Sequence, residues 1–443
     1  MSKKRYVLIG TGIRSQYFIS SVVEHRDASE LVAFCDLSPT RMAYSNARLT
    51  GELGYHEIPT YLADQFDRML KEQRPDCVIV TSKDVTHCDY IVRALRAGCD
   101  VITEKPMTID AEKCRLILAT AAETKRKVLV AFNYRWSSHR TKVKELISAG
   151  TIGNVKSVDL EYLLNTGHGA DYYRRWHAHL AESGGLLVHK STHHFDLVNW
   201  WIDGIPEQVF AYGRLDFYGK KNAIARGEAD RTTYDRYTGH PNSNNDPFYL
   251  DLKSSSDLEG LYLKAEKDSG YVRDRNVFRE DIDIYDNMSV VVRYRTGQLL
   301  TYSLLSFSPR EGMRVGINGD RGRIEYHEIQ PTHILPDAEP KERSSEDIGG
   351  ESVHVYPHFK ASYEVPVEIL PGSHNGSDPV LADYLFSASV PPDRTGRPAG
   401  HEQGAASILI GIAANQSITT NRPVQILDLA NLKPGAKRLS ELS

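Results

Sequence analysis

The sequence has few cysteines, no long apolar run and no excess of positive charge. Its five cysteines all lie within the first 114 of 443 residues, and their spacing matches no zinc motif, so we expect reduced, buried thiols. No window approaches the roughly 18 apolar residues that a membrane-spanning helix needs. The net charge of −4 and the pI near 6.5 argue against nucleic acid as the main partner, because phosphate binding needs a basic surface.

We also expect no signal peptide at the start of the chain. The basic tip of "MSKKRYVLIG" is followed by a strand-like run with glycine instead of a long apolar core, so we expect a cytoplasmic protein. An apolar content of 40% and a charged content of 25% are ordinary for a globular protein. The length suggests two or three domains.

The first part of the chain alternates strand-like and helix-like segments. Continuous apolar runs are typical of parallel strands that are covered on both faces, and segments such as 89–98 and 111–125 between the runs have helical period. The runs are "RYVLIG", "ELVAFCD", "DCVIVTS", "CDVITEK" and "KVLVAFN". This pattern predicts a doubly wound parallel α/β domain over residues 1–130.

The later segments have a different pattern. Several alternate apolar and polar residues, and turns near residues 295–298 and 320–322 predict two hairpins. A helix is expected over 404–421. We therefore predict that residues 131–443 form an α+β domain with a large, open, mainly antiparallel sheet.

A polar stretch, residues 219–286, interrupts this second domain. It is too long for an ordinary loop, and we interpret it as an insertion that covers a site or an interface; the alternative is a solvated excursion. Residues 336–351 are acidic and rich in serine, and we expect them to be mobile.

A glycine-rich turn follows the first strand. Gly10 and Gly12 match the first two glycines of a dinucleotide fingerprint, and Ser15 takes the place of the third. Asp36 ends the second strand, where a carboxylate accepts hydrogen bonds from ribose hydroxyls, which favours NAD over NADP; Arg41 keeps NADP possible. The NH groups of the turn would hold the pyrophosphate at the helix N-terminus. The predicted cofactor-binding residues here are Gly10, Thr11, Gly12, Ile13, Arg14 and Asp36.

The fifth strand ends on Glu104, Lys105 and Pro106. A doubly wound sheet binds its ligand at the carboxyl ends of its strands. An ammonium group held there could reach the nicotinamide end of a dinucleotide, so we predict that Glu104 and Lys105 contact the cofactor. The alternative is a surface salt bridge between Glu104 and a basic residue.

These motifs, together with later ones in the same order, resemble the Gfo/Idh/MocA family of NAD(P)-dependent oxidoreductases. The motifs are "GTGIRS", "CDLSPTR", "TSKDVTH", "EKPMT", "VAFNYRW", "SGGLLVHKSTHHFDLVNWW" and "SILIGIAANQSITTNRPVQI". The resemblance covers both domains but not the insertion. It implies a Rossmann domain, an open α/β domain whose sheet commonly forms oligomer interfaces, and substrates that are mostly sugars, polyols and their derivatives.

The resemblance also implies roles for individual residues. Lys105 matches the active-site lysine and His193 the catalytic histidine, and Asp196, the acid three residues later, is a candidate substrate contact. Thr81, Ser82 and His87 match a cofactor-side loop, in which Ser82 and Lys83 depart from the usual Pro-Asn. Tyr134 and Arg135 match positions that line the substrate pocket. His189 stands where many dehydrogenases of the family have aspartate.

Three histidines and a lysine lie within residues 189–194. Hydride transfer from an alcohol needs a base with a pKa near the working pH, which suits His193, and a cation that stabilises the alkoxide, which suits Lys105. His189, one helical turn away, would orient the substrate or relay the proton, and His194 would pack structurally. A metal held by His189 and His193 is an alternative, as are plain polar groups at a helix start; no third ligand is fixed by a motif, so we predict no metal.

Residues 168–185 are crowded with aromatic and basic side chains. Sugar sites combine aromatic faces with polar groups, so Trp176 is a candidate substrate contact, and Arg174 or Arg175 would suit a carboxylated sugar. An ordinary packed loop is the alternative.

We therefore predict an NAD-dependent oxidoreductase of a secondary hydroxyl in a sugar, glycoside or cyclitol, acting as a homodimer or homotetramer. The first alternative is a glycosidase that retains NAD and uses oxidation, elimination, hydration and re-reduction. The second is a non-catalytic NAD-binding regulator.

Overall fold

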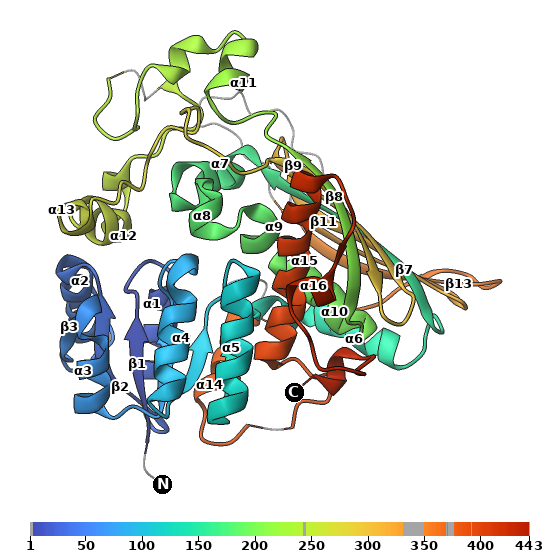
Figure 1. Ribbon diagram of the computed structural model, residues 1–443, viewed down its shortest axis with the longest axis horizontal. Helices are drawn as coiled ribbons and strands as arrows, with labels where there is room; N and C mark the ends of the chain where they lie inside the picture. The colour runs from blue at the N-terminus through green and yellow to red at the C-terminus, as the bar shows by residue number, and fades with distance from the viewer. Residues whose placement is uncertain are drawn as a thin grey trace.

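The computed structural model describes residues 3–241, 245–330, 350–368, 370, 376–390 and 392–442, and it contains two sheets that lie side by side (Figure 1). All but the last two residues of the predicted mobile stretch, 336–351, lie outside the described residues. Within the described residues, we find no helix with the length and hydropathy to cross a membrane.

The first sheet has seven strands in the order β15-β6-β5-β4-β1-β2-β3. Six are parallel, namely β1 (Lys4–Ile9), β2 (Ser29–Asp36), β3 (Thr60–Leu62), β4 (Cys77–Val80), β5 (Asp100–Thr103) and β6 (Val128–Val130). The helices between them are α1 (Ser15–Glu24), α2 (Pro39–Gly51), α3 (Phe66–Gln73), α4 (His87–Arg96) and α5 (Ala111–Thr124). The predicted doubly wound domain is confirmed.

Both faces of this sheet are covered. Tyr6 and Leu8 of β1 pack with Phe18 of α1 in one apolar cluster, while Val7 and Ile9 pack in the other. Because successive side chains of a strand point to opposite faces, a strand between two layers has to be apolar throughout. The five cysteines are free and buried, as predicted.

The chain returns to this first layer near its end. The helix α14 (Ser377–Phe386) packs against α1, and the short strand β15 (Ala399–Gly400) pairs antiparallel with β6. Phe386 is buried, with its ring 5.2 Å from that of Tyr6. Residues from the last quarter of the chain therefore complete one face of the first sheet.

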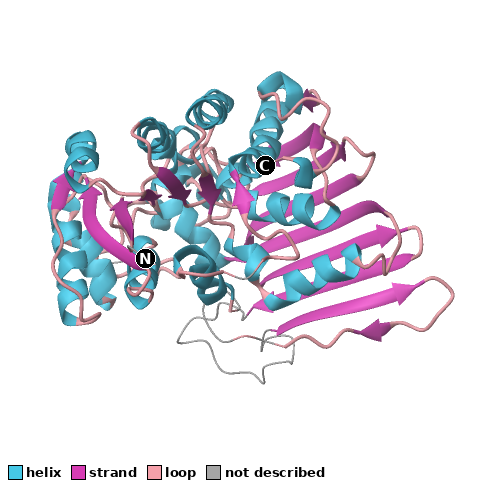
Figure 2. Cartoon of the chain, turned by 90° about the horizontal axis from the view of Figure 1, so that it is seen from below, coloured by secondary structure: helices cyan, strands magenta, loops and turns pink. Residues whose placement is uncertain are grey.

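The second sheet has nine strands in the order β14-β13-β12-β11-β7-β10-β9-β8-β16 (Figure 2). Its strands are β7 (Val155–Asn165), β8 (Pro206–Arg214), β9 (Asn287–Tyr294), β10 (Leu299–Ser308), β11 (Glu311–Gly319), β12 (Gly322–Gln330), β13 (Gly350–Pro357), β14 (Tyr363–Glu364) and β16 (Val424–Gln425). The pairing is antiparallel except between β7 and β10, which are parallel, and both predicted hairpins are present. The mainly antiparallel sheet is thus confirmed.

Helices cover one face of the second sheet and carry part of the candidate site. They include α6 (Ser138–Ser148), α10 (Thr192–Ile202) and α15 (His401–Thr420), which matches the helix expected over 404–421. The helix α10 follows α7 (Thr166–Arg174), α8 (Leu180–Ser183) and α9 (Leu186–His189) and is buried over its whole length. The segment 166–202 therefore lies between the two sheets.

The insertion arches away from the second sheet and comes down on the first layer. Its helices are short: α11 (Lys220–Ala225), α12 (Ser256–Leu258) and α13 (Glu266–Ser269). In Figure 1, α11 lies in the part of the insertion that is remote from the first layer, whereas α12 and α13 lie above α2.

We expect Phe386→Ala to lower the free energy of unfolding by about 3–5 kcal/mol, because it removes a buried ring and leaves a cavity against Tyr6. Urea denaturation followed by circular dichroism would measure the change. Leu427→Ala is the control: this side chain is 64% exposed, so its loss should cost no more than about 0.5 kcal/mol. Equal effects of the two variants would contradict the packing described for α14.

Candidate active site

The glycine turn between β1 and α1 is held against two neighbouring strand ends. Gly10 has φ +86°, and a Cβ atom there would lie 2.6 Å from the backbone of Ser82, so only glycine fits. Thr81 Oγ1 donates to the carbonyl of Gly10 at 2.7 Å. Asp36 Oδ2 accepts from the backbone N and the Oγ1 of Thr11, at 2.6 and 3.0 Å. The turn, the helix N-terminus and the carboxylate at the end of β2 together fit a dinucleotide.

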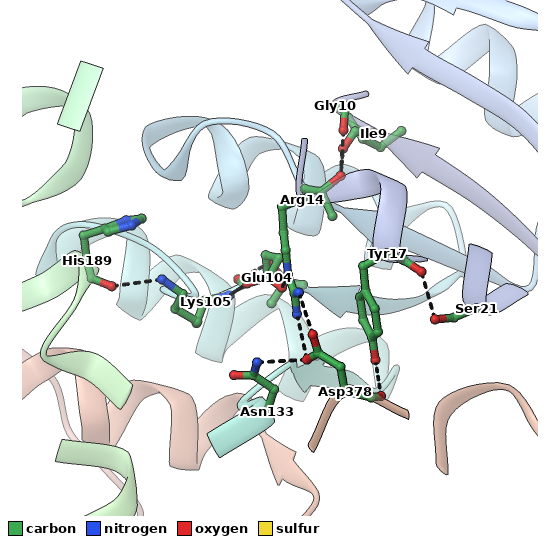
Figure 3. Close-up of polar contacts among 12 residues, drawn as sticks. Ile9, Gly10, Arg14, Tyr17, Ser21, Glu104, Lys105, Asn133, His189 and Asp378 are labelled. Carbon is green, nitrogen blue, oxygen red and sulfur yellow. Dashed lines mark hydrogen bonds and ion pairs between the residues drawn. The ribbon is translucent and has the colours of Figure 1, made fainter. Parts of the chain in front are cut away.

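A partly buried ion-pair network joins this turn to the end of β5 (Figure 3). Arg14 Nε lies 2.6 Å from Glu104 Oε1, and Arg14 NH1 lies 3.2 Å from Asp378 Oδ2. Asn133 donates to the same Asp378 carboxylate at 2.9 Å. Burial opposes the charge of Arg14, but Glu104 and Asp378 outweigh it and raise the pKa of the guanidinium. The Arg14 side chain is thus held by two carboxylates, and its backbone NH is the group that would meet a phosphate.

Lys105 follows Glu104 and reaches across to the second domain. Its Nζ donates to the backbone carbonyl of His189 at 3.3 Å (Figure 3). Burial lowers the pKa of Lys105 to about 8, although the carboxylates of Glu104 and Asp84 act in the opposite direction. The ammonium therefore loses its proton much closer to neutral pH than an ordinary lysine does.

The side chain of His189 binds a carboxylate. Its Nδ1 lies 2.5 Å from Asp84 Oδ2, in the loop that follows β4. Burial raises the pKa of Asp84 well above its usual range and lowers that of His189. The rings of His177 and Trp176 surround His189, with centroids 4.1 and 5.9 Å away. Asp84 was not predicted, because it lies 105 residues from its partner.

His193 and His194 have different surroundings. The His193 ring stacks on Tyr134, with centroids 4.1 Å apart, and its edge faces Phe132, both of which follow β6. Lys105 follows β5, and the two rings that contact His193 follow the neighbouring strand β6. Lys105 and His193 therefore both lie at the carboxyl-terminal end of the first sheet. His194 instead bonds Tyr302 through Nδ1 at 2.9 Å and packs on Tyr162, in the structural position that we expected for it.

Arg135 and Asp196 need a correction. We predicted substrate contacts for both, but each is fully buried, and they form a two-point ion pair with both N–O distances at 2.7 Å. Arg135 also donates to Gln403 Oε1 at 2.8 Å, and Ser407 donates to Asp196. These two side chains therefore fix α10 against β6 and α15 and have no free face for a ligand.

The side chains of the predicted cofactor-side loop brace its backbone. Ser82 Oγ and Thr86 Oγ1 lie 2.7 Å apart. The His87 ring lies between the carbonyls of Pro106 and Ser82, at 2.8 and 3.0 Å, and burial lowers its pKa. This loop thus holds the end of β4 to the segment that carries Lys105, whose peptide bond to Pro106 is cis.

Several side chains of the aromatic segment before α10 pack on other side chains or pair with them. Trp176 stacks on His177 with centroids 3.6 Å apart, beside His189. Arg174 is buried and donates to the carbonyl of Phe248 in the insertion, so it is not free for a carboxylated ligand. Asp171 pairs with Arg175 at 3.2 Å and with Arg273 of the insertion at 2.6 Å.

The insertion contacts the cofactor-binding loops directly. The hydroxyl of Tyr262 accepts a hydrogen bond from the backbone N of Ile13 at 3.2 Å. The same oxygen would lie 3.7 Å from a Cβ atom built on Gly12. Arg41 Nε donates to the carbonyl of Leu261 at 2.8 Å. The insertion therefore packs on the first domain and is not a purely solvated excursion. No periodicity in the sequence signals these contacts, because they are purely tertiary.

We find no metal cluster in the ranges that the structure describes: no three histidine, cysteine, aspartate or glutamate side chains gather there in a way that could hold an ion.

Comparison with known proteins identifies both domains. The description "Oxidoreductase family, NAD-binding Rossmann fold" matches residues 4–132, and "Oxidoreductase family, C-terminal alpha/beta domain" matches residues 144–426. The chain belongs to the Gfo/Idh/MocA oxidoreductase family. It is accordingly an NAD(P)-dependent oxidoreductase with an NAD-binding Rossmann domain.

One relative matches almost the whole chain, and others match about half of it. YteT of Bacillus subtilis (strain 168), which is named as an oxidoreductase, is 36% identical over 97% of this chain and 99% of its own length. The inositol 2-dehydrogenase of Rhizobium meliloti (strain 1021) is 30% identical over 47% of this chain and 57% of its own length. The D-glucoside 3-dehydrogenase of Escherichia coli (strain K12) is 26% identical over 53% of this chain and 64% of its own length.

Solved structures share the fold at low identity. The aldose-aldose oxidoreductase from Caulobacter crescentus complexed with glycerol has a TM-score of 0.62 and 16% identity, over 96% of this chain and 100% of that one. The WlbA dehydrogenase from Bordetella pertussis, in complex with NADH and UDP-GlcNAcA, has the same TM-score and identity, over 96% and 99%.

We expect Arg135→Ala to lower the free energy of unfolding by about 3–5 kcal/mol, because it leaves the carboxylate of Asp196 buried and unpaired. Chemical denaturation would measure this loss. The double variant Arg135→Met/Asp196→Leu removes both charges and should recover most of it. A double variant no more stable than the single one would contradict this assignment.

Proposed function

We propose that this enzyme transfers a hydride between NAD and a secondary hydroxyl or ketone of a sugar, glycoside or cyclitol. The observation that carries the proposal is the position of Lys105 and His193 at one edge of the first sheet, beside the strand ends where a dinucleotide binds. Names of relatives that act on inositol and glucosides support the substrate class. We propose residues 1–130 as the NAD-binding domain and residues 131–443 as the substrate domain.

The cofactor-binding roles follow the turn and the strand ends. The NH groups of Gly12 and Arg14 would hold the pyrophosphate, whereas that of Ile13 is bound to the hydroxyl of Tyr262. Asp36 would hold the adenosine ribose, and Glu104 and Lys105 the nicotinamide end. Thr81, Ser82 and His87 would shape the loop beside it. When bound, NAD supplies the acceptor for the hydride.

Side chains of this protein would accept the hydroxyl proton and stabilise the negative charge that develops on the substrate oxygen. As the carbinol C–H is lost as hydride, His193 takes the hydroxyl proton and the C–O bond becomes a carbonyl. The Lys105 ammonium stabilises the negative charge on that oxygen. His189, with its Nδ1 bound by Asp84, would orient a second hydroxyl through Nε2, and Trp176 would pack on the sugar ring. The ring of Tyr134, which we predicted as a substrate contact, instead lies against His193 and under the guanidinium of Arg140, so it would position His193.

The pKa of Lys105, about 8, predicts the alkaline limb of the pH profile. As pH rises through 8 the ammonium is lost, so kcat/KM should fall there. Lys105→Arg keeps its charge at high pH, so it should move the limb to a more alkaline pH, whereas Lys105→Met should lower kcat/KM roughly 10²–10³-fold. Steady-state kinetics between pH 6 and 10 would test this.

The control is Lys113→Arg, a partly exposed lysine on α5 whose substitution should leave the profile unchanged. His193→Ala should reduce kcat/KM roughly 10²–10⁴-fold with little change in NAD affinity. A limb that stays in place in Lys105→Arg would count against the role of this ammonium.

The contacts of the insertion favour a second candidate, a glycosidase that oxidises, eliminates, hydrates and re-reduces its substrate with NAD retained. Tyr262 and Leu261 lie against the glycine turn and the loop after β2, the two segments that would hold the dinucleotide. Such a cover suits a cofactor that is recycled in place.

Two assays separate the candidates. A net dehydrogenase should accumulate NADH steadily in the presence of sugars. The redox-neutral enzyme should keep NAD through gel filtration and release aglycone from aryl glycosides without added cofactor, because each cycle restores the oxidised cofactor. Purified protein that carries no NAD and releases no aglycone would eliminate the second candidate.

We also propose self-association through the open face of the second sheet. Large side chains of three adjacent strands are exposed there: Tyr212 is 63%, Val291 48% and Leu299 49% exposed. Apolar side chains gathered on one sheet face suit an interface between subunits.

A further inference from the structure

The insertion places a carboxylate at the N-terminus of α2, where the adenosine half of a dinucleotide binds. Ser38 Oγ donates to Asp268 Oδ2 at 2.5 Å, and the backbone N of Thr40 donates to the same oxygen at 3.1 Å. Ser38 is the N-cap of α2, and its own backbone N donates to Asp36 Oδ1 at 2.8 Å. One residue thus bridges two carboxylates, one from β2 and one from a segment 230 residues later.

These are the groups that a ribose 2′-phosphate would need. A phosphate at the end of β2 binds to hydroxyl and backbone N–H donors at a helix N-terminus and to a nearby arginine. Here the hydroxyl of Ser38 and the N–H of Thr40 are occupied by Asp268.

The nearby arginine is occupied as well. Arg41 Nε donates to the carbonyl of Leu261, and its guanidinium lies over the rings of Tyr262 and Tyr271, with centroid distances of 5.6 and 5.9 Å. It lies 3.8 Å from Asp36. A second negative charge therefore stands beside Asp36, and the available cation is turned to the insertion.

We propose that Asp268 is a specificity-determining residue, carried by the insertion, that excludes the 2′-phosphate of NADP and so makes the enzyme selective for NAD. This inference rests on the proposed use of NAD by the enzyme. A phosphate group of charge near −2 would have to displace Asp268 from Ser38 and Thr40 or lie beside it, and either cost is absent for a ribose with a free 2′-hydroxyl.

A capping role alone is the competing explanation, since a carboxylate at a helix N-terminus also stabilises the helix. Asp268→Asn separates the two, because the amide oxygen can still accept from Ser38 and Thr40 while the charge is gone. Asp268→Ala removes both. The matched control is Asp230→Asn, which changes the net charge equally. Asp230 is exposed and lies in the turn Ala229–Thr232, which packs on α11.

The experiment measures the Kd of NAD and of NADP by titration calorimetry for the purified full chain and the three variants, after removal of any bound nucleotide. We expect Asp268→Asn and Asp268→Ala to lower the ratio of the NADP Kd to the NAD Kd by about tenfold, with the NAD Kd changed less than threefold. Because the effect is electrostatic, the ratio of the unmodified protein should also fall as salt is raised, and Asp230→Asn should leave it unchanged.

A ratio within twofold of the original in both Asp268 variants, with NAD binding intact, would overturn the inference and leave the proposed function standing. An equal drop in Asp230→Asn would overturn it too, since any charge would then suffice. Failure of the unmodified protein to bind NAD would overturn both the inference and the proposed function.

Discussion

The ion pair between Arg14 and Glu104 is the contact on which the arrangement of the site depends. It ties the helix that follows the glycine turn to the last residue before Lys105, with an N–O distance of 2.6 Å; the Arg14 side chain is 30% exposed and that of Glu104 10%. A partly buried pair of this kind contributes little net stability, but removal of one partner leaves the other charge uncompensated. Its value here is geometric, because it sets the distance between the turn that would hold the pyrophosphate and the ammonium that would act on the substrate. Asp378 is the second carboxylate that binds the Arg14 guanidinium.

Each of the three neighbouring histidines has its own partner. His189 binds Asp84 from the first domain, His193 stacks on Tyr134, and His194 bonds Tyr302 of the second sheet. Lys190, between them, donates to the hydroxyl of Tyr134; burial opposes its charge, yet the phenols of Tyr134 and Tyr172 and the carboxylate of Glu311 raise its pKa. One short segment therefore fastens the two sheets to each other while it presents His193 at their junction.

Local patterns predicted the parts of this protein that depend on neighbours in sequence. Apolar runs identified the strands of the first sheet, and glycine followed by an acid one strand later identified the dinucleotide-binding end. The partners that arrive from afar could not be predicted in this way, among them Asp84, Tyr262, Asp268 and Asp378. Arg135 and Asp196 were misjudged for a related reason: a sequence does not say whether a polar side chain faces a ligand or another side chain, and here they face each other.

The late return of α14 to the first layer bears on how the chain folds during synthesis. The hydroxyl of Tyr6 donates to the carbonyl of Leu385, a separation of 379 residues, and Ser29 Oγ donates to the carbonyl of Phe386. Until the ribosome has extruded that helix, the part of one apolar face of the first sheet that α14 covers stays open to water and to other nascent chains. The amino-terminal half, although it is made first, therefore has to wait for almost the entire polypeptide before it is sealed, which is the period in which a chaperone would be most useful to it.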